Sequence, residues 1–300
     1  MKMMKILHYI IFLVIVIGIA VIPTSVMAHG PDFRSYRDDD RPDKIGVLVI
    51  ALVPRDAATA TKQELMDKRI KEAFPGLAVR WSFFDIGSGQ ADAFMTTGDQ
   101  MSPKQMLDQM EEEGITHLAI LPLAIIPGET YTRLVWMVDS LREMPTKFRK
   151  ISLARPFFGG PEDIRRTCQT VLDILPGHAK KGEAVVLFFE EQSRLGDYIY
   201  PGIQYHFWQL DKSVFVGTAG TAPDVQDVAR SLDERKASRI YLVPFLPYQS
   251  PALASWKKSL AKKGRKVNVV KQAVVGQQAA MDVMISRLQA AIDELGLAER

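Results

Sequence analysis

Short apolar runs alternate with amphipathic stretches along most of this chain, and the whole alternation occurs twice. In each round a strand-length apolar run precedes a segment whose apolar residues recur every three or four positions, as in a helix packed on one side. Continuous apolar runs of this length are typical of strands buried on both faces of a parallel sheet. The pattern therefore predicts an α/β protein with two similar domains, each a parallel β-sheet flanked by helices.

The expected elements divide into two equivalent series. The strands of the first series are expected at Ile45–Leu52, Ala78–Phe84, His117–Ile126 and Lys150–Pro156, with helices at Thr61–Phe74, 102–113, Thr130–Leu141 and Pro161–Leu175. The strands of the second series are expected at Ala184–Phe189, Ser213–Thr218, Arg239–Phe245 and Lys266–Val270, with helices at Tyr198–Leu210, Pro223–Lys236, Pro251–Lys263 and Gln277–Leu295.

The two series also share letters at equivalent places. HLAILPLAIIPGE (117–129) aligns with RIYLVPFLPYQSP (239–251) on Pro122 and Pro244. The common order of elements, together with this likeness, indicates an internal duplication. The turn-rich, charged stretch PGHAKKG (176–182) would join the halves. We place the N-terminal domain at 44–178 and the C-terminal domain at 179–300.

The first residues differ in character from the rest. Lys2 and Lys5 precede a mostly apolar run from Ile6 to Ile22, and Val26-Met27-Ala28 follows as a small-residue cleavage motif. This arrangement predicts a signal peptide over 1–28 and a polar leader over 29–43, so the folded part is expected in the periplasm or secreted. A membrane anchor formed by an uncleaved signal is the alternative, because the apolar run is slightly long for a signal peptide.

Composition limits the classes of partner and site. Without residues 1–28 the chain would carry 36 basic and 35 acidic residues, which does not favour a nucleic-acid partner. Cys168 is the one cysteine, so the sequence has neither a disulfide framework nor a thiolate metal site. Cys168 recurs at helical spacing with apolar residues and is expected in a core.

Several stretches resemble those of the class II tetrapyrrole chelatases, and most closely the anaerobic sirohydrochlorin cobaltochelatases. They are TKQELMDKRIKEAFPGL (61–77), HLAILPLAIIPGETYTRL (117–134) and VGTAGTAPDVQDVARSLDERKASRIYLVPF (216–245). The resemblance implies two α/β domains with a cleft between them in which a tetrapyrrole sits. It also implies Co²⁺ or Fe²⁺ held by side chains at the carboxyl ends of the strands, the usual ligand location in open parallel sheets.

The chain departs from the family pattern where the family holds its metal. The family's histidine at the end of the first strand of the second domain corresponds to Glu190, which follows the apolar run VVLFF (185–189). The second histidine corresponds to a position near Ala252, and a family glutamate falls near Gly220. In the loop after the third strand, Glu129 and Tyr131 are kept. The resemblance therefore leaves Glu129 and Glu190 as catalytic and metal-binding candidates and Tyr131 as a ring-contacting candidate.

These replacements change the chemistry that is available. Metallation needs a ligand for the ion and a base for two pyrrole protons, and imidazole can serve both purposes near neutral pH. A carboxylate is a weaker ligand for cobalt and, with an unperturbed pKa of about 4.3, a poorer base. His206, beside Phe207 and Trp208, is the remaining histidine that could serve as an axial ligand to haem, although a partly buried structural histidine on a helix is the commoner case.

Three functions stay open on the sequence. The first is a sirohydrochlorin cobaltochelatase-like enzyme of cobalamin or sirohaem biosynthesis. The second is a catalytically inactive periplasmic protein that binds a tetrapyrrole or a metal, serves an uptake system and forms homo-oligomers. The third is an interaction protein without a ligand.

Overall fold

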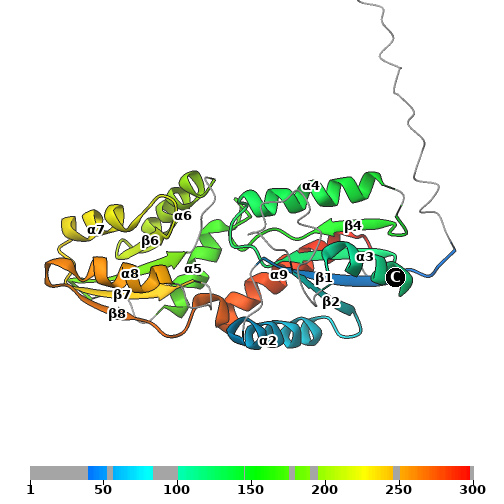
Figure 1. Cartoon of the computed structure of the whole chain (residues 1–300), viewed down its shortest axis with the longest axis horizontal. Helices are drawn as coiled ribbons and strands as arrows, with labels where there is room; N and C mark the ends of the chain where they lie inside the picture. The colour runs from blue at the N-terminus through cyan, green and yellow to red at the C-terminus, as the bar shows by residue number, and fades with distance from the viewer. Residues whose placement is uncertain are drawn as a thin grey trace, which may run out of the picture.

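The computed structural model describes residues 40–52, 57–83, 101–144, 146–175, 180–189, 195–245 and 251–297. Within these ranges the chain forms two four-stranded parallel sheets, one in each half of the sequence, with helices against them (Figure 1). This confirms the predicted α/β class. No helix in the same ranges is long and apolar enough to cross a bilayer, and the run 6–22 lies outside them.

The first sheet has the strand order β2-β1-β3-β4. Its strands are β1 (Ile45–Ala51), β2 (Ala78–Phe83), β3 (His117–Pro122) and β4 (Lys150–Leu153). The helices between them are α2 (Ala57–Ala73), α3 (Pro103–Glu112) and α4 (Glu129–Glu143). Strand β1 lies between β2 and β3, so the connection from β2 to β3 passes over β1, and every hydrogen-bonded pair is parallel, as strand–helix units require.

The second sheet repeats this arrangement with the order β6-β5-β7-β8. Its strands are β5 (Glu183–Phe189), β6 (Val214–Thr218), β7 (Arg239–Pro244) and β8 (Lys266–Val269). The helices of this half of the sequence are α6 (Gly196–Leu210), α7 (Val225–Glu234), α8 (Pro251–Leu260) and α9 (Gln278–Glu294). Helix α5 (Ile164–Ile174) connects the two sheets, and the short helices η2 (Lys262–Gly264) and η3 (Val274–Gly276) flank β8.

The strand registers are equivalent in the two sheets. Pro122 of β3 lies opposite Ile50 of β1, and Pro244 of β7 lies opposite Phe188 of β5. After each proline the next residue donates its N–H to the same partner position, Leu123 to Ile50 O and Phe245 to Phe188 O, both at 2.9 Å. The alignment of the halves on their prolines is therefore confirmed. The strand expected over 117–126 ends at Pro122, because the chain turns after this shared hydrogen bond toward α4.

Capping residues fix the starts of two helices, one as expected and one not. Helix α3 begins at Pro103 after the predicted Ser102, because Ser102 accepts a hydrogen bond from Gln105 N and the Gln105 side chain accepts one from Ser102 N. The helix expected from Pro223 begins at Val225, since the Asp224 side chain caps it in the same reciprocal way.

Side chains on alternate positions of each central strand enter different cores. Val47 and Val49 of β1 join a cluster that also contains Val185 and Leu187 of β5, so this cluster extends across both halves. Leu48 and Ile50 face a second cluster beneath α3 and α4, and Val186 and Phe188 face a third beneath α7 and α8. Each sheet thus has an outer core of its own and shares an inner core with the other sheet. Cys168 is fully buried in the shared core, as expected.

Two helices cross between the halves. Helix α9, at the end of the chain, packs on β3 and β4 of the first sheet and against α2, and α5 packs against α6 of the second half (Figure 1). Polar contacts hold α9 there: Arg69 of α2 pairs with Asp282 at 2.7 Å, and Ser152 of β4 donates to Glu294 at 2.6 Å. The first sheet is therefore completed by the last helix of the chain.

Close packing against β6 makes Gly217 a sensitive position. A Cβ at Gly217 would lie 2.4 Å from the Trp256 ring of α8, which itself packs edge-on to Phe188. We expect Gly217→Ala to lower the free energy of unfolding by about 1–3 kcal/mol, because the buried indole has to move. Urea unfolding followed by Trp fluorescence measures this.

The matched control is Gly202→Ala on α6, where an added Cβ meets nothing within 4 Å. This change should be neutral or stabilise the protein by up to about 1 kcal/mol through helix propensity. Equal stability of the two variants would contradict the packing account of Gly217.

Candidate functional site

The carboxyl ends of both sheets point toward the middle of the molecule (Figure 1). Ring contacts confirm that these ends meet. Phe157, which follows β4, lies 5.3 Å between ring centroids from Phe245, which follows β7, and Phe158 lies 6.4 Å from Phe189 at the end of β5. The site that a parallel sheet offers at its carboxyl edge is therefore built from both halves at once.

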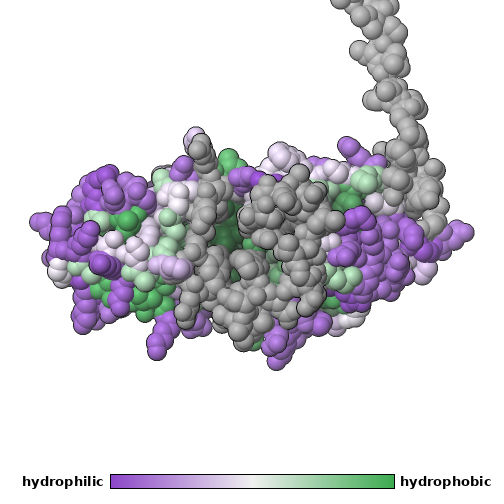
Figure 2. Space-filling view, viewed as in Figure 1, coloured by the Kyte–Doolittle hydropathy of each residue, from purple (hydrophilic) through white to green (hydrophobic). Residues whose placement is uncertain are grey.

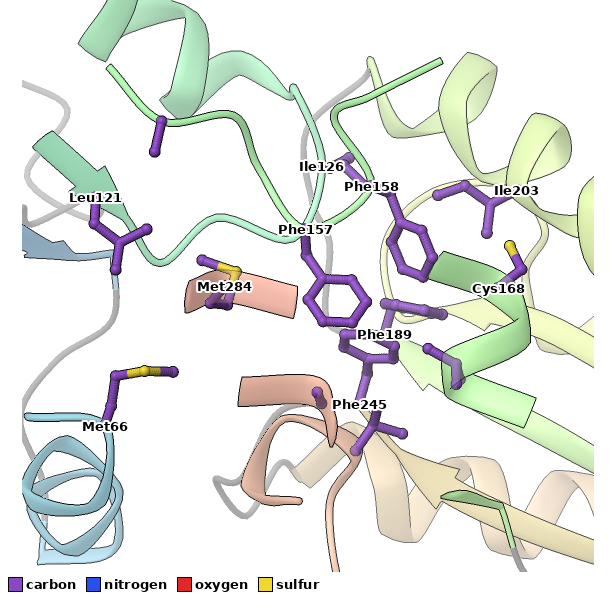
Figure 3. Packing of buried hydrophobic residues seen from close by; sticks show 14 of the residues in the cluster. Met66, Leu121, Ile126, Phe157, Phe158, Cys168, Phe189, Ile203, Phe245 and Met284 are labelled. Atoms are coloured by element: carbon purple, nitrogen blue, oxygen red, sulfur yellow. The ribbon is translucent and has the colours of Figure 1, made fainter. Parts of the chain in front are cut away.

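Five phenylalanines form an aromatic cluster at this junction, and Figure 3 labels four of them, Phe157, Phe158, Phe189 and Phe245. Phe189 and Phe245 stack with centroids 4.4 Å apart, and Phe157 and Phe158 pack edge-on to each other at 4.9 Å. Phe207 of α6 lies 6.3 Å from Phe158. All five are buried. Where these residues lie, aromatic side chains fill the space between the halves, so a ligand has to bind beside this cluster.

The β4–α5 segment that carries Phe157 and Phe158 is fixed by a buried cation. Arg287 of α9 pairs with Asp163 and donates to the Phe157 carbonyl at 2.9 Å and to Thr167 Oγ1 at 3.3 Å. Arg287 is 6% exposed. Burying a guanidinium is unfavourable unless it is paired, so this network ties the crossing helix to the junction.

The structure describes the strand up to Phe189, the residue before Glu190. Phe189, the last residue of β5, is 1% exposed and stacks on Phe245. Glu190 follows it and lies outside the described residues. Its assignment as metal ligand or base stays a prediction.

Glu129 begins α4, directly after the β3 strand and its loop. It is exposed, and its Oε1 accepts a hydrogen bond from Arg133 Nη2 at 2.6 Å. A carboxylate in the first turn of a helix is also stabilised by the helix dipole. The structure thus places Glu129 at the carboxyl edge, as predicted from its position after a strand, and gives its charge a cationic neighbour one helical turn away.

Tyr131 lies in the first turn of the same helix and is half-buried against the outer core of the first sheet. Burial raises the pKa of its phenol, and the nearby Arg155 guanidinium only partly opposes this. The phenol therefore stays protonated at neutral pH, so Tyr131 can donate a hydrogen bond but is unsuited to act as a base.

His206 lies on α6 in the second half and is half-buried. Its imidazole packs edge-on against the Tyr205 ring at 5.5 Å. The adjacent positions Ile203 and Phe207 form the buried face of the helix. Glu129 and Tyr131 share one helix of the first half, whereas His206 belongs to the other half.

The two remaining family positions, Gly220 and Ala252, have no side-chain atom that could bind a metal ion. Gly220 is in the turn after β6, which Thr218 holds by hydrogen bonds to Thr221, and Ala252 is in the first turn of α8. Across the described part of the chain, no group of three or more His, Cys, Asp and Glu side chains is placed to hold a metal ion. Any metal-binding carboxylate at the β5 end would act without partners from these two positions.

The other described histidine, His117, lies on a strand at the edge of the first sheet opposite the carboxyl edge. His117 starts β3 and is buried between Thr116, whose Oγ1 lies 3.0 Å from Nδ1, and Asp43 at 3.8 Å. Burial lowers the pKa of its imidazole, with Asp43 acting in the opposite direction. It lies at the amino end, as the sequence predicted, and serves the packing of residues 40–44.

Sequence reasoning missed the aromatic cluster and the Arg287 network. The doubled phenylalanine separated from β4 by three residues, and Phe245 directly after Pro244, were the available signal for the cluster. Arg287 gave no signal, because a single arginine within an amphipathic helix resembles a surface cation.

Two parallel sheets of equal strand order, joined at their carboxyl edges and completed by crossing helices, define a duplicated α/β protein whose candidate site lies at the junction. Comparison with known proteins identifies the class as that of the chelatases. The family model "Cobalt chelatase (CbiK)" matches residues 47–293, so the chain belongs to that family.

Curated and solved relatives point the same way. Sirohydrochlorin cobaltochelatase CbiKC of Nitratidesulfovibrio vulgaris is 26% identical over 261 residues, which cover 84% of this chain and 92% of that protein. SirB from Bacillus subtilis with Fe³⁺ is similar in structure with a TM-score of 0.60 at 15% identity, covering 85% of this chain and 98% of SirB. SirB from B. subtilis subspecies spizizenii in complex with cobalt gives 0.58 at 14% identity with the same coverage.

Proposed function

We propose that this protein is a tetrapyrrole chelatase that inserts Co²⁺, or alternatively Fe²⁺, into sirohydrochlorin. The observation that carries the proposal is membership of the cobalt chelatase family over residues 47–293, with both sheets intact and in the same order. The name of the curated relative supports sirohydrochlorin and cobalt, and the two SirB structures, one with Fe³⁺ and one in complex with cobalt, support iron and cobalt as the metals.

The reaction exchanges two protons for one divalent ion. The metal binds the ring nitrogens, two pyrrole N–H bonds break, and both protons leave to a base or to water. In this proposal Glu190 holds the incoming ion and receives a proton. Glu129 lies at the facing edge and receives the second proton, with Arg133 holding its carboxylate in place. Tyr131, kept protonated by burial, donates a hydrogen bond to a carboxylate of the ring.

A second candidate is a protein that binds the ring or the ion without inserting one into the other. The absence of side-chain donors at Gly220 and Ala252 favours it, because a lone carboxylate holds cobalt weakly. In this case His206 would be the axial ligand to haem, and the protein would serve an uptake system outside the cytoplasm. The signal peptide over 1–28 and the periplasmic location belong to both proposals.

A metallation assay separates the two candidates. Purified protein is mixed with sirohydrochlorin and Co²⁺, and insertion is followed by the absorbance of the ring. We expect a rate above the spontaneous one, and Glu190→Gln should lower it by roughly 10²-fold or more, as loss of a general base does.

The matched control is Glu143→Gln, at the opposite end of α4 from Glu129 and exposed. Its rate should equal that of the wild type. A spectral shift on ring binding with no insertion above the spontaneous rate would reject the chelatase in favour of the carrier. No shift with sirohydrochlorin, haem or Co²⁺ would reject both.

A further inference from the structure

The amino ends of the second sheet carry an unusual concentration of positive charge. Four sequence windows precede or begin its strands: 180–183, 211–213, 233–239 and 257–266. They contain twelve basic and four acidic residues. We call this surface the basic edge. Because strand starts in a parallel sheet lie at one edge, the four windows gather at the end of the second half, which Figure 2 shows as a mainly hydrophilic surface at the left.

The duplicated fold supplies an internal comparison. The four structurally equivalent windows of the first half are 42–45, 75–77, 111–117 and 141–150, aligned on the starts of β1 to β4. They contain five basic and five acidic residues. The fold is the same in both halves, so it does not require the excess charge, which is a property of the second half alone.

Most of this charge is exposed and is not neutralised by neighbours. Asp233 pairs with Lys263 at 2.6 Å and with the buried Arg265, and Glu183 pairs with Arg239 at 2.9 Å. Within the described residues no carboxylate pairs with the four exposed lysines at the end of α8 and the start of β8. These are Lys257, Lys258, Lys262 and Lys266.

The kind of side chain favours one type of anionic partner. Nine of the twelve basic residues are lysines. Protein–protein interfaces are depleted in lysine and enriched in arginine and aromatic residues, and specific nucleic-acid contacts also favour arginine. Clustered lysines without an exposed aromatic anchor suit the diffuse attraction of an anionic lipid surface. The apolar run 6–22 is consistent with a chain that reaches a membrane.

We propose that the basic edge binds the surface of an anionic phospholipid bilayer through Lys257, Lys258, Lys262 and Lys266. The interaction is electrostatic, so it does not require insertion of any described helix into the bilayer. It is independent of the metallation reaction, because these residues lie at the amino ends of the strands, opposite the carboxyl edge that carries the candidate site.

The test uses co-sedimentation of the full chain with vesicles of neutral phosphatidylcholine and with vesicles that contain one quarter phosphatidylglycerol. Each lysine near an anionic surface contributes roughly a fivefold change in binding. We therefore expect that changing the four lysines together to glutamine lowers binding to the anionic vesicles by about 100-fold or more. Binding to neutral vesicles should be equal in all variants.

The control removes four lysines from the first half instead: Lys68, Lys71, Lys104 and Lys147, each changed to glutamine. All four are exposed, and the variant has the same net charge as the test variant. The control variant should bind anionic vesicles as the wild type does. Raising NaCl from about 0.1 M to about 1 M should release the wild type and the control variant from these vesicles, because the Debye length shortens. Equal loss in both variants, or no loss in the test variant, would overturn the proposal. Tighter binding to a short DNA duplex than to the anionic vesicles at the same salt would also overturn it.

Discussion

Replacing Arg287 with methionine is expected to lower the free energy of unfolding by about 3–5 kcal/mol. The guanidinium is buried at the junction of α9, the β4–α5 segment and the shared core, where it pairs with Asp163 and donates to the Phe157 carbonyl. Methionine removes the cation and leaves the Asp163 carboxylate, which is one-quarter exposed, without its main partner. Urea unfolding, followed by circular dichroism, measures the loss.

Two comparisons make this prediction specific. Arg69→Met breaks an ion pair with Asp282 whose side chains are 33% and 42% exposed, and should cost less than about 1 kcal/mol. Adding Asp163→Leu to Arg287→Met should recover part of the loss, since removing both charges leaves no unpaired one. If the double variant loses as much free energy of unfolding as the two single variants lose together, or more, the ion pair is not the main contribution of Arg287.

Phe157→Ala should destabilise the protein by about 3–5 kcal/mol. Phe157 is 0% exposed, contacts the rings of Phe158 and Phe245, and so joins a segment of the first half to a strand end of the second. Truncation leaves a cavity whose rigid aromatic walls cannot collapse easily. Thermal and urea unfolding measure the change in stability.

The control for Phe157 is Trp136→Ala on α4, because that indole is 66% exposed. We expect a change within about 0.5 kcal/mol, as for most surface positions. If Phe157→Ala is as mild as Trp136→Ala, the aromatic cluster does not stabilise the junction between the halves.

Much of the fold could be predicted because it depends on local pattern. Strands buried on both faces are continuous apolar runs, and the helices between them show a 3.6-residue period, so both series of elements were expected in the right order. The equivalence of Pro122 and Pro244 was visible in the letters and is confirmed by the hydrogen bonds of the residues after them.

The crossing of α5 and α9 could not be predicted in this way. Periodicity shows that a helix has an apolar face but does not identify the sheet that the face covers. The sequence places α9 after β8, yet its partners are β3 and β4, more than one hundred residues earlier. Arg287 and Asp163 are charged residues on two such helices, and only the crossing brings them together.

The candidate site was predicted in position more than in detail. Glu129 begins the helix that follows β3, and its role in the site stays a prediction. Its ion pair with Arg133 depends on a helix start that the sequence placed one residue later. Glu190 lies outside the described residues. The burial of Tyr131 depends on tertiary packing against the outer core, which the spacing of residues does not specify.

The placement of α9 has a consequence for the order in which the molecule can be assembled. A ribosome makes residues 278–294 after every strand of both sheets, yet β3 and β4 need them as a cover. Until α9 is made, the face of the first sheet that it covers lacks this packing partner. The first half therefore cannot mature as an independent unit ahead of the second, because its last cover follows the second sheet in the sequence.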